Sequence, residues 1–370
     1  MGSEVLIYGY GLVCLSMLAF NLIYSLYLRG AGRRTRRRKE HIAAVVVPAL
    51  SGSRVPEGHT ERMADMLRQV KDLLALDDYL QTLPEEIAGE YITRIAGIFP
   101  GLAKYYDGRD DMFCAYFSHF VQCWGRYMTV ERRKLAQTIS LYENKNSLYC
   151  RVNALKALCT LGDAGVLLDA LVYLAAENEE DFPINDKIVV ELLLKFEGDS
   201  REFIELIWDR FERFPPLHQR ALLDYIRFKS GDYSDKMLDI LTDTGRDKEL
   251  RLSAIRYFTR YPDERARTSL LGFVSDKDPA NWEYAAIAAS ALAEYPGEDS
   301  VDVLSEAMHS GNWYVRSNSA ESLEKLGFRY EDLLGKAAAE DRYAREMLTY
   351  RLETRMLNAE RDKAKEAAKA

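Results

Sequence analysis

An internal repeat constrains the fold of this chain more than any single motif. Counting from Arg316, small or apolar residues stand at +3, +4, +7 and +10, and Gly327 follows at +11. The same apolar spacing begins at six reference positions, which are 151, 186, 218, 251, 285 and 316. These positions are separated by 35, 32, 33, 34 and 31 residues. A nearly constant period of this size is typical of an array of supersecondary units.

Each copy of the repeat predicts a helical hairpin. Steps of 3, 4 and 7 residues place the apolar side chains on one stripe of a helix. A second helical pattern opens on Asp or Glu-Asp, side chains that favour a helix N-terminus, after Gly162, Gly198, Pro262 and Gly297. One hairpin cannot bury its own apolar stripe, so neighbouring hairpins must stack. The predicted fold class is all-α, an α-solenoid.

The segment from Val315-Arg316 to Gly327 resembles the first helix of the HEAT-repeat family, which often reads V-R-x-x-A-x-x-x-L-x-x-L-G. Arg151 to Gly162 shows the same pattern, with Cys150 in place of Val. The resemblance covers about 115 to 340 and implies a right-handed solenoid. It also implies that the repeat arginines tie neighbouring units by pairing with carboxylates; they are Arg151, Arg251 and Arg316. The pattern departs from the family where Arg is replaced, at Asp186, His218 and Ala285.

The first residues predict a membrane anchor. Val5 to Leu28 is a run of 24 residues without a charged side chain. At about 1.5 Å per residue, a helix of this length crosses a hydrocarbon core of about 30 Å. A cleaved signal peptide is the alternative, but its positive charge precedes the apolar run, whereas here Glu4 precedes it. We expect an uncleaved transmembrane helix over 5–28.

A basic cluster follows the apolar run: Arg29, Arg33, Arg34, Arg36, Arg37, Arg38 and Lys39. Positive charge marks the cytoplasmic end of a membrane helix, so we expect the N-terminus outside and the remaining chain in the cytoplasm. The cluster also suits contact with anionic lipid head groups. It opens an expected juxtamembrane segment and linker over 29–59, in which the apolar patch 42–50 is either flexible or a docking peptide.

The repeat also divides the remaining chain. We expect an N-terminal helical cap over 60–108, the HEAT-like array over 109–345, and a charged C-terminal helix or tail over 346–370. A cap is required because the first hairpin of a stack otherwise exposes its apolar face.

Charge and cysteine usage exclude several classes of function. Without the basic cluster, the chain carries 43 Lys and Arg against 57 Asp and Glu over 40–370, a net charge of −14. Such a body repels phosphate backbones, so no nucleic-acid partner is expected. The five cysteines are odd in number and form no CxxC pair. We expect a reducing compartment, and we expect the chain to have neither a disulfide framework nor a zinc site.

No motif assembles a catalytic centre. The five histidines are scattered, and the chain has no HExxH, GxxxxGK[ST] or GxSxG sequence. Adjacent acidic pairs such as Asp77-Asp78 are more often helix starts than acid/base pairs. We therefore expect no enzymatic activity, no cofactor, no metal and no small-molecule substrate.

Two Asn-Trp pairs are the candidate partner-binding residues. Asn281-Trp282 and Asn312-Trp313 both stand 3 residues before a reference position, so the two pairs are expected to lie one above the other. Tryptophan is enriched in protein contacts because it supplies a large area and a polar group. The alternative is that each Trp packs onto the neighbouring repeat.

Anchor and array together predict a membrane-anchored cytoplasmic scaffold that binds a protein partner. The layout resembles membrane-anchored bacterial envelope proteins, which implies a membrane glycosyltransferase or an envelope polysaccharide complex as the partner. One alternative is a HEAT-like enzyme of the DNA glycosylase or bilin lyase type, although the acidic body disfavours DNA. Another is a module that receives a peptide or nucleotide signal.

Overall fold

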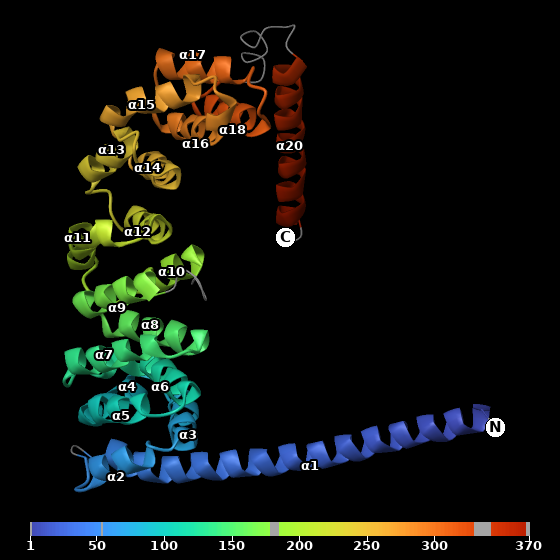
Figure 1. Cartoon of the computed structure of the whole chain (residues 1–370), viewed down its shortest axis with the longest axis vertical. Coiled ribbons are helices and arrows are strands. Elements are labelled where there is room, and N and C mark those ends of the chain that lie inside the picture. The colour runs from blue at the N-terminus through green and yellow to red at the C-terminus, as the bar shows by residue number, and fades with distance from the viewer. Residues whose placement is uncertain (1, 53–54, 178–184, 329–341, 368–370) are drawn as a thin grey trace. The chain divides into compact units, whose positions relative to one another are not determined.

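The computed structural model describes residues 2–52, 55–177, 185–328 and 342–367 (Figure 1). This described part consists of helices and their connections and contains no strand. Internal contacts divide the chain into two units. Unit 1 comprises Met1–Pro183 and Lys195–Leu206, and unit 2 comprises Ile184–Leu194 and Ile207–Ala370. Each unit is described by itself.

Unit 1 stacks its helices in two layers. Helices α3, α6 and α8 follow one another in one layer, and α5, α7 and α9 follow one another in the other. The bounds are α1 (Gly2–Ser51), α2 (His59–Met66), α3 (Val70–Leu80), α4 (Glu85–Arg94), α5 (Phe99–Asp107), α6 (Asp111–Trp124), α7 (Arg132–Ser140), α8 (Leu148–Leu161) and α9 (Ala164–Glu177).

Unit 2 has the same two-layered order. Helices α10, α12, α14, α16 and α18 form one layer, and α13, α15 and α17 form the other, while α11 (Ser200–Arg210) crosses the division between the units. The bounds are α10 (Asp186–Leu193), α12 (Pro216–Lys229), α13 (Ser234–Thr242), α14 (Lys248–Arg260), α15 (Glu264–Ser275), α16 (Trp282–Ala291), α17 (Glu298–Ala307), α18 (Trp313–Lys325) and α20 (Arg342–Ala367).

The repeat predicted these elements correctly. Each of the six reference positions falls in a helix of the layer named first for its unit. These helices are α8 in unit 1 and α10, α12, α14, α16 and α18 in unit 2. The all-α class and the stacked helical hairpins are therefore confirmed. The handedness implied by the resemblance stays a prediction.

Side-chain donors from one hairpin bind main-chain carbonyls of the hairpin before it. In unit 1 the Tyr106 hydroxyl donates to Leu67 O at 2.7 Å, and the Tyr142 hydroxyl donates to Ala103 O at 2.6 Å. Both tyrosines are fully buried, and each bond spans 39 residues. In unit 2 Ser322 Oγ donates to Ala289 O at 2.7 Å across 33 residues. Because buried carbonyls must be bonded, these ties fix the stacking register.

The expected linker over 29–59 is wrong as far as Ser51, because α1 continues as one helix to that residue. Ile42, Val45, Val46 and Ala49 are buried, and α1 packs against α3 and α4. The apolar patch 42–50 therefore docks within the chain, where it covers the first helices of unit 1. Pro48 lies inside the helix.

Polar contacts fix this docking. Arg38 Nη1 lies 2.5 Å from Asp72 Oδ1 on α3. Arg94 of α4 donates to the carbonyls of Ala49 and Gly52, the latter at 2.7 Å. These bonds satisfy carbonyls near the C-terminus of α1, which have no partner within the helix.

A close approach of two glycine backbones joins α8 to the connection before α11. Gly162 ends α8 with φ +68°, and the main chain of Gly198 lies against it. A Cβ atom at Gly198 would stand 2.3 Å from Gly162 O and 2.4 Å from the Phe196 ring. Only glycine fits this contact.

We expect Gly198→Ala to lower the free energy of unfolding by about 2 kcal/mol or more, because the methyl group forces the two backbone segments apart. Gly101→Ala in α5 is the matched control, since nothing lies within 4 Å of its added Cβ. That control is expected to raise stability by about 0.5 kcal/mol through helix propensity. Urea unfolding of the full chain in detergent, followed by circular dichroism, compares them, and equal effects would contradict the contact.

Glu143 is a buried carboxyl group in unit 1. It lies in the short helix Leu141–Asn144, its side chain has no exposed surface, and neither carboxyl oxygen has a hydrogen-bond partner. Burial raises the pKa of Glu143 well above its ordinary value of 4.5, while Arg151 opposes the shift. Between the ordinary pKa and the raised one, the folded chain therefore keeps this proton, whereas the unfolded chain releases it.

Glu143→Gln is expected to stabilise the protein by an amount that grows with pH. Above about pH 4.5 the wild type loses stability relative to the variant as pH rises toward the folded pKa, by up to about 1.4 kcal/mol per pH unit, because unfolding releases a proton. Unfolding of both chains at pH 6 and pH 8 measures this difference. A difference that does not change with pH would contradict the buried, protonated carboxyl.

Candidate protein-binding groove

Four aromatic side chains gather where α16, α18 and α20 meet in unit 2. The Trp282 ring stacks on the Tyr314 ring, with centroids 5.6 Å apart and planes at 25°. Trp313 lies edge-on to Tyr314 at 5.2 Å and to Tyr350 of α20 at 5.9 Å. The two tryptophans therefore lie on successive repeats, as predicted. It is Tyr314, however, and not Trp313, that stacks on Trp282.

Three of these rings keep about half of their surface exposed to solvent. The exposed fractions are 45% for Trp313, 56% for Tyr314 and 47% for Tyr350. A single exposed aromatic residue is ordinary, but a contiguous group offers a large rigid apolar area that water solvates poorly. We call these three residues, together with Trp282, the aromatic cluster.

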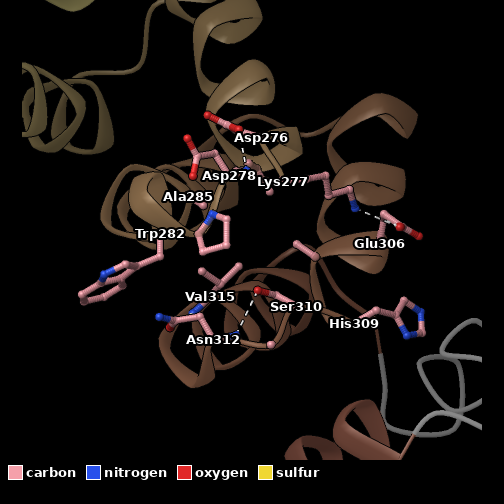
Figure 2. A pocket seen from close by; sticks show the side chains of 14 residues that line it. Asp276, Lys277, Asp278, Trp282, Ala285, Glu306, His309, Ser310, Asn312 and Val315 are labelled. Atoms are coloured by element: carbon pink, nitrogen blue, oxygen red, sulfur yellow. Dashed lines mark hydrogen bonds and ion pairs between the residues drawn. The ribbon is translucent and has the colours of Figure 1, made fainter.

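A groove of about 500 Å³ lies beside Trp282, between the α15–α16 connection and the α17–α18 connection. Figure 2 shows Asp276 and Asp278 on one side of it, and Ser310 and Asn312 on the other. Its apolar lining includes Val274, Pro279, Ala285, Ala307 and Val315.

Acidic side chains line the mouth of the groove. Asp276 accepts hydrogen bonds from Asp278 N at 2.9 Å and from Asn281 Nδ2 at 2.8 Å, and these bonds lower its pKa. Glu306 pairs with Lys277 at 3.0 Å, and that ammonium lowers the Glu306 pKa. The carboxylates are therefore ionised at neutral pH. Among the described residues, no group of three or more His, Cys, Asp and Glu side chains is arranged to hold a metal ion.

The two predicted asparagines differ in role. Asn312 is the N-cap of α18, and its Oδ1 accepts from Tyr314 N at 2.9 Å and Val315 N at 3.4 Å. Asn281 makes no such cap and instead holds Asp276 in place. Asn312 thus has a clear structural role, which its equivalent position in the sequence did not reveal.

We expect Asn312→Ala to lower the free energy of unfolding by about 1 kcal/mol, because two main-chain N–H groups of α18 lose their acceptor. Asn312→Asp keeps the acceptor and should remain within about 0.3 kcal/mol of the wild type. Asn281→Ala is the matched control and removes one exposed hydrogen bond but no cap. Thermal unfolding of the three variants tests this order, and a larger loss for Asn281→Ala would contradict it.

Part of unit 2 matches a known protein family. The model for HEAT repeats matches residues 234–324. Residues 234–324 are HEAT repeats. No curated protein matches the chain in sequence. The matched residues run from α13 through α18 and include the groove and three members of the aromatic cluster.

The arginines of these HEAT repeats bind main-chain carbonyls and aromatic rings. Arg316 Nη1 donates to Ser310 O at 2.6 Å, and its guanidinium lies 4.9 Å from the Tyr343 ring centre. Arg251 Nε donates to Leu241 O at 3.2 Å, and its guanidinium lies 5.1 Å from the rings of both Phe273 and Tyr284.

Upstream of the matched segment, Arg151 Nε makes the same kind of bond, to Lys145 O at 2.6 Å. These bonds go to main-chain carbonyls, and Arg151 also lies close enough to the Glu143 carboxyl group to oppose the rise in its pKa. The pairing with carboxylates implied by the resemblance stays a prediction. Carbonyls at a helix end lack intrahelical partners, and a guanidinium offers several donors in a fixed plane.

The membrane-proximal basic cluster lies along α1, not in the groove. Arg33, Arg34, Arg36 and Arg37 are exposed, and Arg36 pairs with Glu40 within the helix at 3.0 Å. Arg38 and Lys39 are half-buried, and Arg38 binds Asp72. Arg29 lies in the same helix, but its side chain is outside the described part.

Sequence reasoning missed several residues of the aromatic cluster and of the groove. Tyr314 and Tyr350 complete the aromatic cluster, and Asp276, Asp278 and Glu306 supply the charge. Tyr314 had a signal, because it directly follows Trp313 in the repeat. Tyr350 had none, because it reaches the cluster from a helix beyond the last copy of the repeat.

Proposed function

We propose that this protein is a membrane-anchored, non-enzymatic scaffold whose HEAT repeats bind a protein partner through the groove and the aromatic cluster. The observation that carries the proposal is the group of exposed rings beside a groove within the HEAT-matched segment. Rigid aromatic side chains dominate the binding energy of protein interfaces. HEAT repeats are generally protein-interaction scaffolds.

Helix α1 supports the anchor. Tyr8–Ser25 is a predominantly apolar stretch of 18 residues, none of them buried. Length and composition suit a membrane span or a signal sequence. We favour a span because the positive side chains follow the apolar stretch, which also places the N-terminus outside and the HEAT repeats in the cytoplasm. The exposed arginines after it suit anionic lipid heads.

The continuity of α1 gives the anchor a mechanical role. The same helix that carries the apolar stretch buries Ile42 and Val46 against the first helices of unit 1. A flexible linker would leave the body free to tumble beneath the membrane. A continuous helix instead limits how far unit 1 can turn relative to the bilayer.

A membrane partner fits this arrangement. A scaffold held at the cytoplasmic face raises the local concentration of its surface for proteins in the same membrane. The layout resembles bacterial envelope accessory proteins, so we propose a membrane glycosyltransferase or an envelope polysaccharide complex as the partner.

Crosslinking in membranes of the native cells, followed by affinity capture of the full chain, tests the proposal. We expect one stable membrane partner, and we expect Trp313→Ala to reduce its recovery about tenfold or more, because the variant removes a central ring of the cluster. Tyr149→Ala is the matched control, since Tyr149 is 51% exposed on α8, outside the aromatic cluster.

Either of two outcomes would contradict the proposal. If repeated captures return no membrane protein, the scaffold function fails. If Trp313→Ala and Tyr149→Ala reduce recovery equally, the binding surface lies elsewhere.

A further inference from the structure

We propose that the groove binds a lysine- or arginine-bearing segment of the partner, with the aliphatic stem of that side chain along the apolar floor and its charged end between the carboxylates. This inference rests on the proposed function, because it names the chemistry of the partner's contact. The inference goes beyond the proposed function because it excludes acidic and purely apolar segments of the partner.

The floor of the groove suits an aliphatic stem. Val274, Ala285 and Val315 line it, and the exposed fraction of each is 5% or less. They contribute methyl groups to its lining, and Figure 2 labels two of them, Ala285 and Val315. Lysine and arginine side chains bury their methylene groups along such surfaces and keep the charged end at the rim.

The rim suits a cationic end. Asp276 and Asp278 lie on the connection after α15, and Glu306 lies on α17 across the groove (Figure 2). Lys277 and His309 are the basic side chains among the lining residues, and both lower the pKa of Glu306.

A cation of the partner can replace Lys277 in its ion pair with Glu306. The Lys277 and Glu306 side chains are 73% and 66% exposed. An exposed pair of this kind contributes little to stability, so an incoming guanidinium or ammonium displaces Lys277 at small cost. A guanidinium also binds a carboxylate with two parallel hydrogen bonds, which a lysine cannot do.

Aromatic faces beside the groove favour the same ligand. A cation over an aromatic ring gains from the negative face of the ring. The chain already uses this contact in the same unit, for example with Arg251 over Tyr284 at 5.1 Å and Arg316 over Tyr343 at 4.9 Å. The exposed ring of Tyr314, stacked on Trp282, offers an equivalent face to a partner.

The expected partner carries the required charge. Cytoplasmic loops of membrane proteins are rich in lysine and arginine. The acidic body, with its net charge of −14 over 40–370, steers such loops toward the chain and repels acidic segments. Groove, rings and net charge therefore all favour a basic loop.

Fluorescence anisotropy tests this inference with the full chain in detergent. The probe is a labelled peptide of alternating leucine and arginine, and the reference is the same peptide with citrulline, the neutral isostere of arginine. We expect the arginine peptide to bind about tenfold or more tightly than the citrulline peptide. We expect Glu306→Gln and Asp278→Asn each to weaken it about threefold to tenfold.

Asp302→Asn is the matched control for Glu306→Gln. Asp302 is exposed one turn earlier on α17 and does not line the groove. The change removes the same charge from the same helix, so we expect an effect below about twofold. Thermal unfolding of each variant confirms that the fold is kept.

Three outcomes would overturn the inference. Equal binding of the citrulline peptide would exclude a role for the cation. An equal loss with Asp302→Asn and Glu306→Gln would assign the binding to overall charge instead of the groove. No binding of either peptide would exclude a basic segment, while a partner still recovered by crosslinking would leave the scaffold function intact.

Discussion

The whole structure depends on one requirement, which is that a helical hairpin cannot satisfy its own ends or bury its own apolar stripe. Each hairpin therefore depends on its neighbours for hydrogen-bond partners and for burial of its stripe. Buried hydroxyls such as those of Tyr106 and Tyr142 donate to carbonyls 39 residues earlier. Arginines such as Arg316 and Arg251 bind carbonyls at the end of the preceding helix. Burial of the stripes supplies the free energy, and these bonds set the register.

The sequence predicted the hairpins because their information is local. Steps of 3, 4 and 7 residues define each stripe, and residues such as Gly162 mark where a helix ends. The tyrosine ties were missed, although Tyr106 and Tyr142 each precede a buried cysteine by 8 residues and bond alike. That period of 36 residues extends the repeat toward the region expected to be only a cap.

Tertiary contacts explain what the sequence did not predict. The patch 42–50 contains Pro48 and lies in a segment rich in small residues, so it was interpreted as a linker. Its helix is stabilised by packing on α3 and α4, which no local pattern reveals. Likewise, Tyr350 joins Trp313 only because α20 packs against α18. The candidate site was half predicted, since Trp282 and Trp313 follow the repeat but the carboxylates of the groove do not.

The two ends of the chain have separate tasks in this account. In the proposed function, helix α1 would join the bilayer to unit 1, and the aromatic cluster and groove of unit 2 would bind the partner. The scaffold function requires both, because a groove without an anchor would bind the same partner but would not hold it at the membrane.

The most direct test is therefore the fate of the N-terminal helix in cells. Membranes are washed with alkaline carbonate, and the N-terminus of the retained full chain is identified by mass spectrometry. The account predicts an intact chain in the membrane pellet, with Tyr8–Ser25 still attached. A soluble chain that lacks those residues would show that they are a cleaved signal sequence, and would contradict the membrane scaffold.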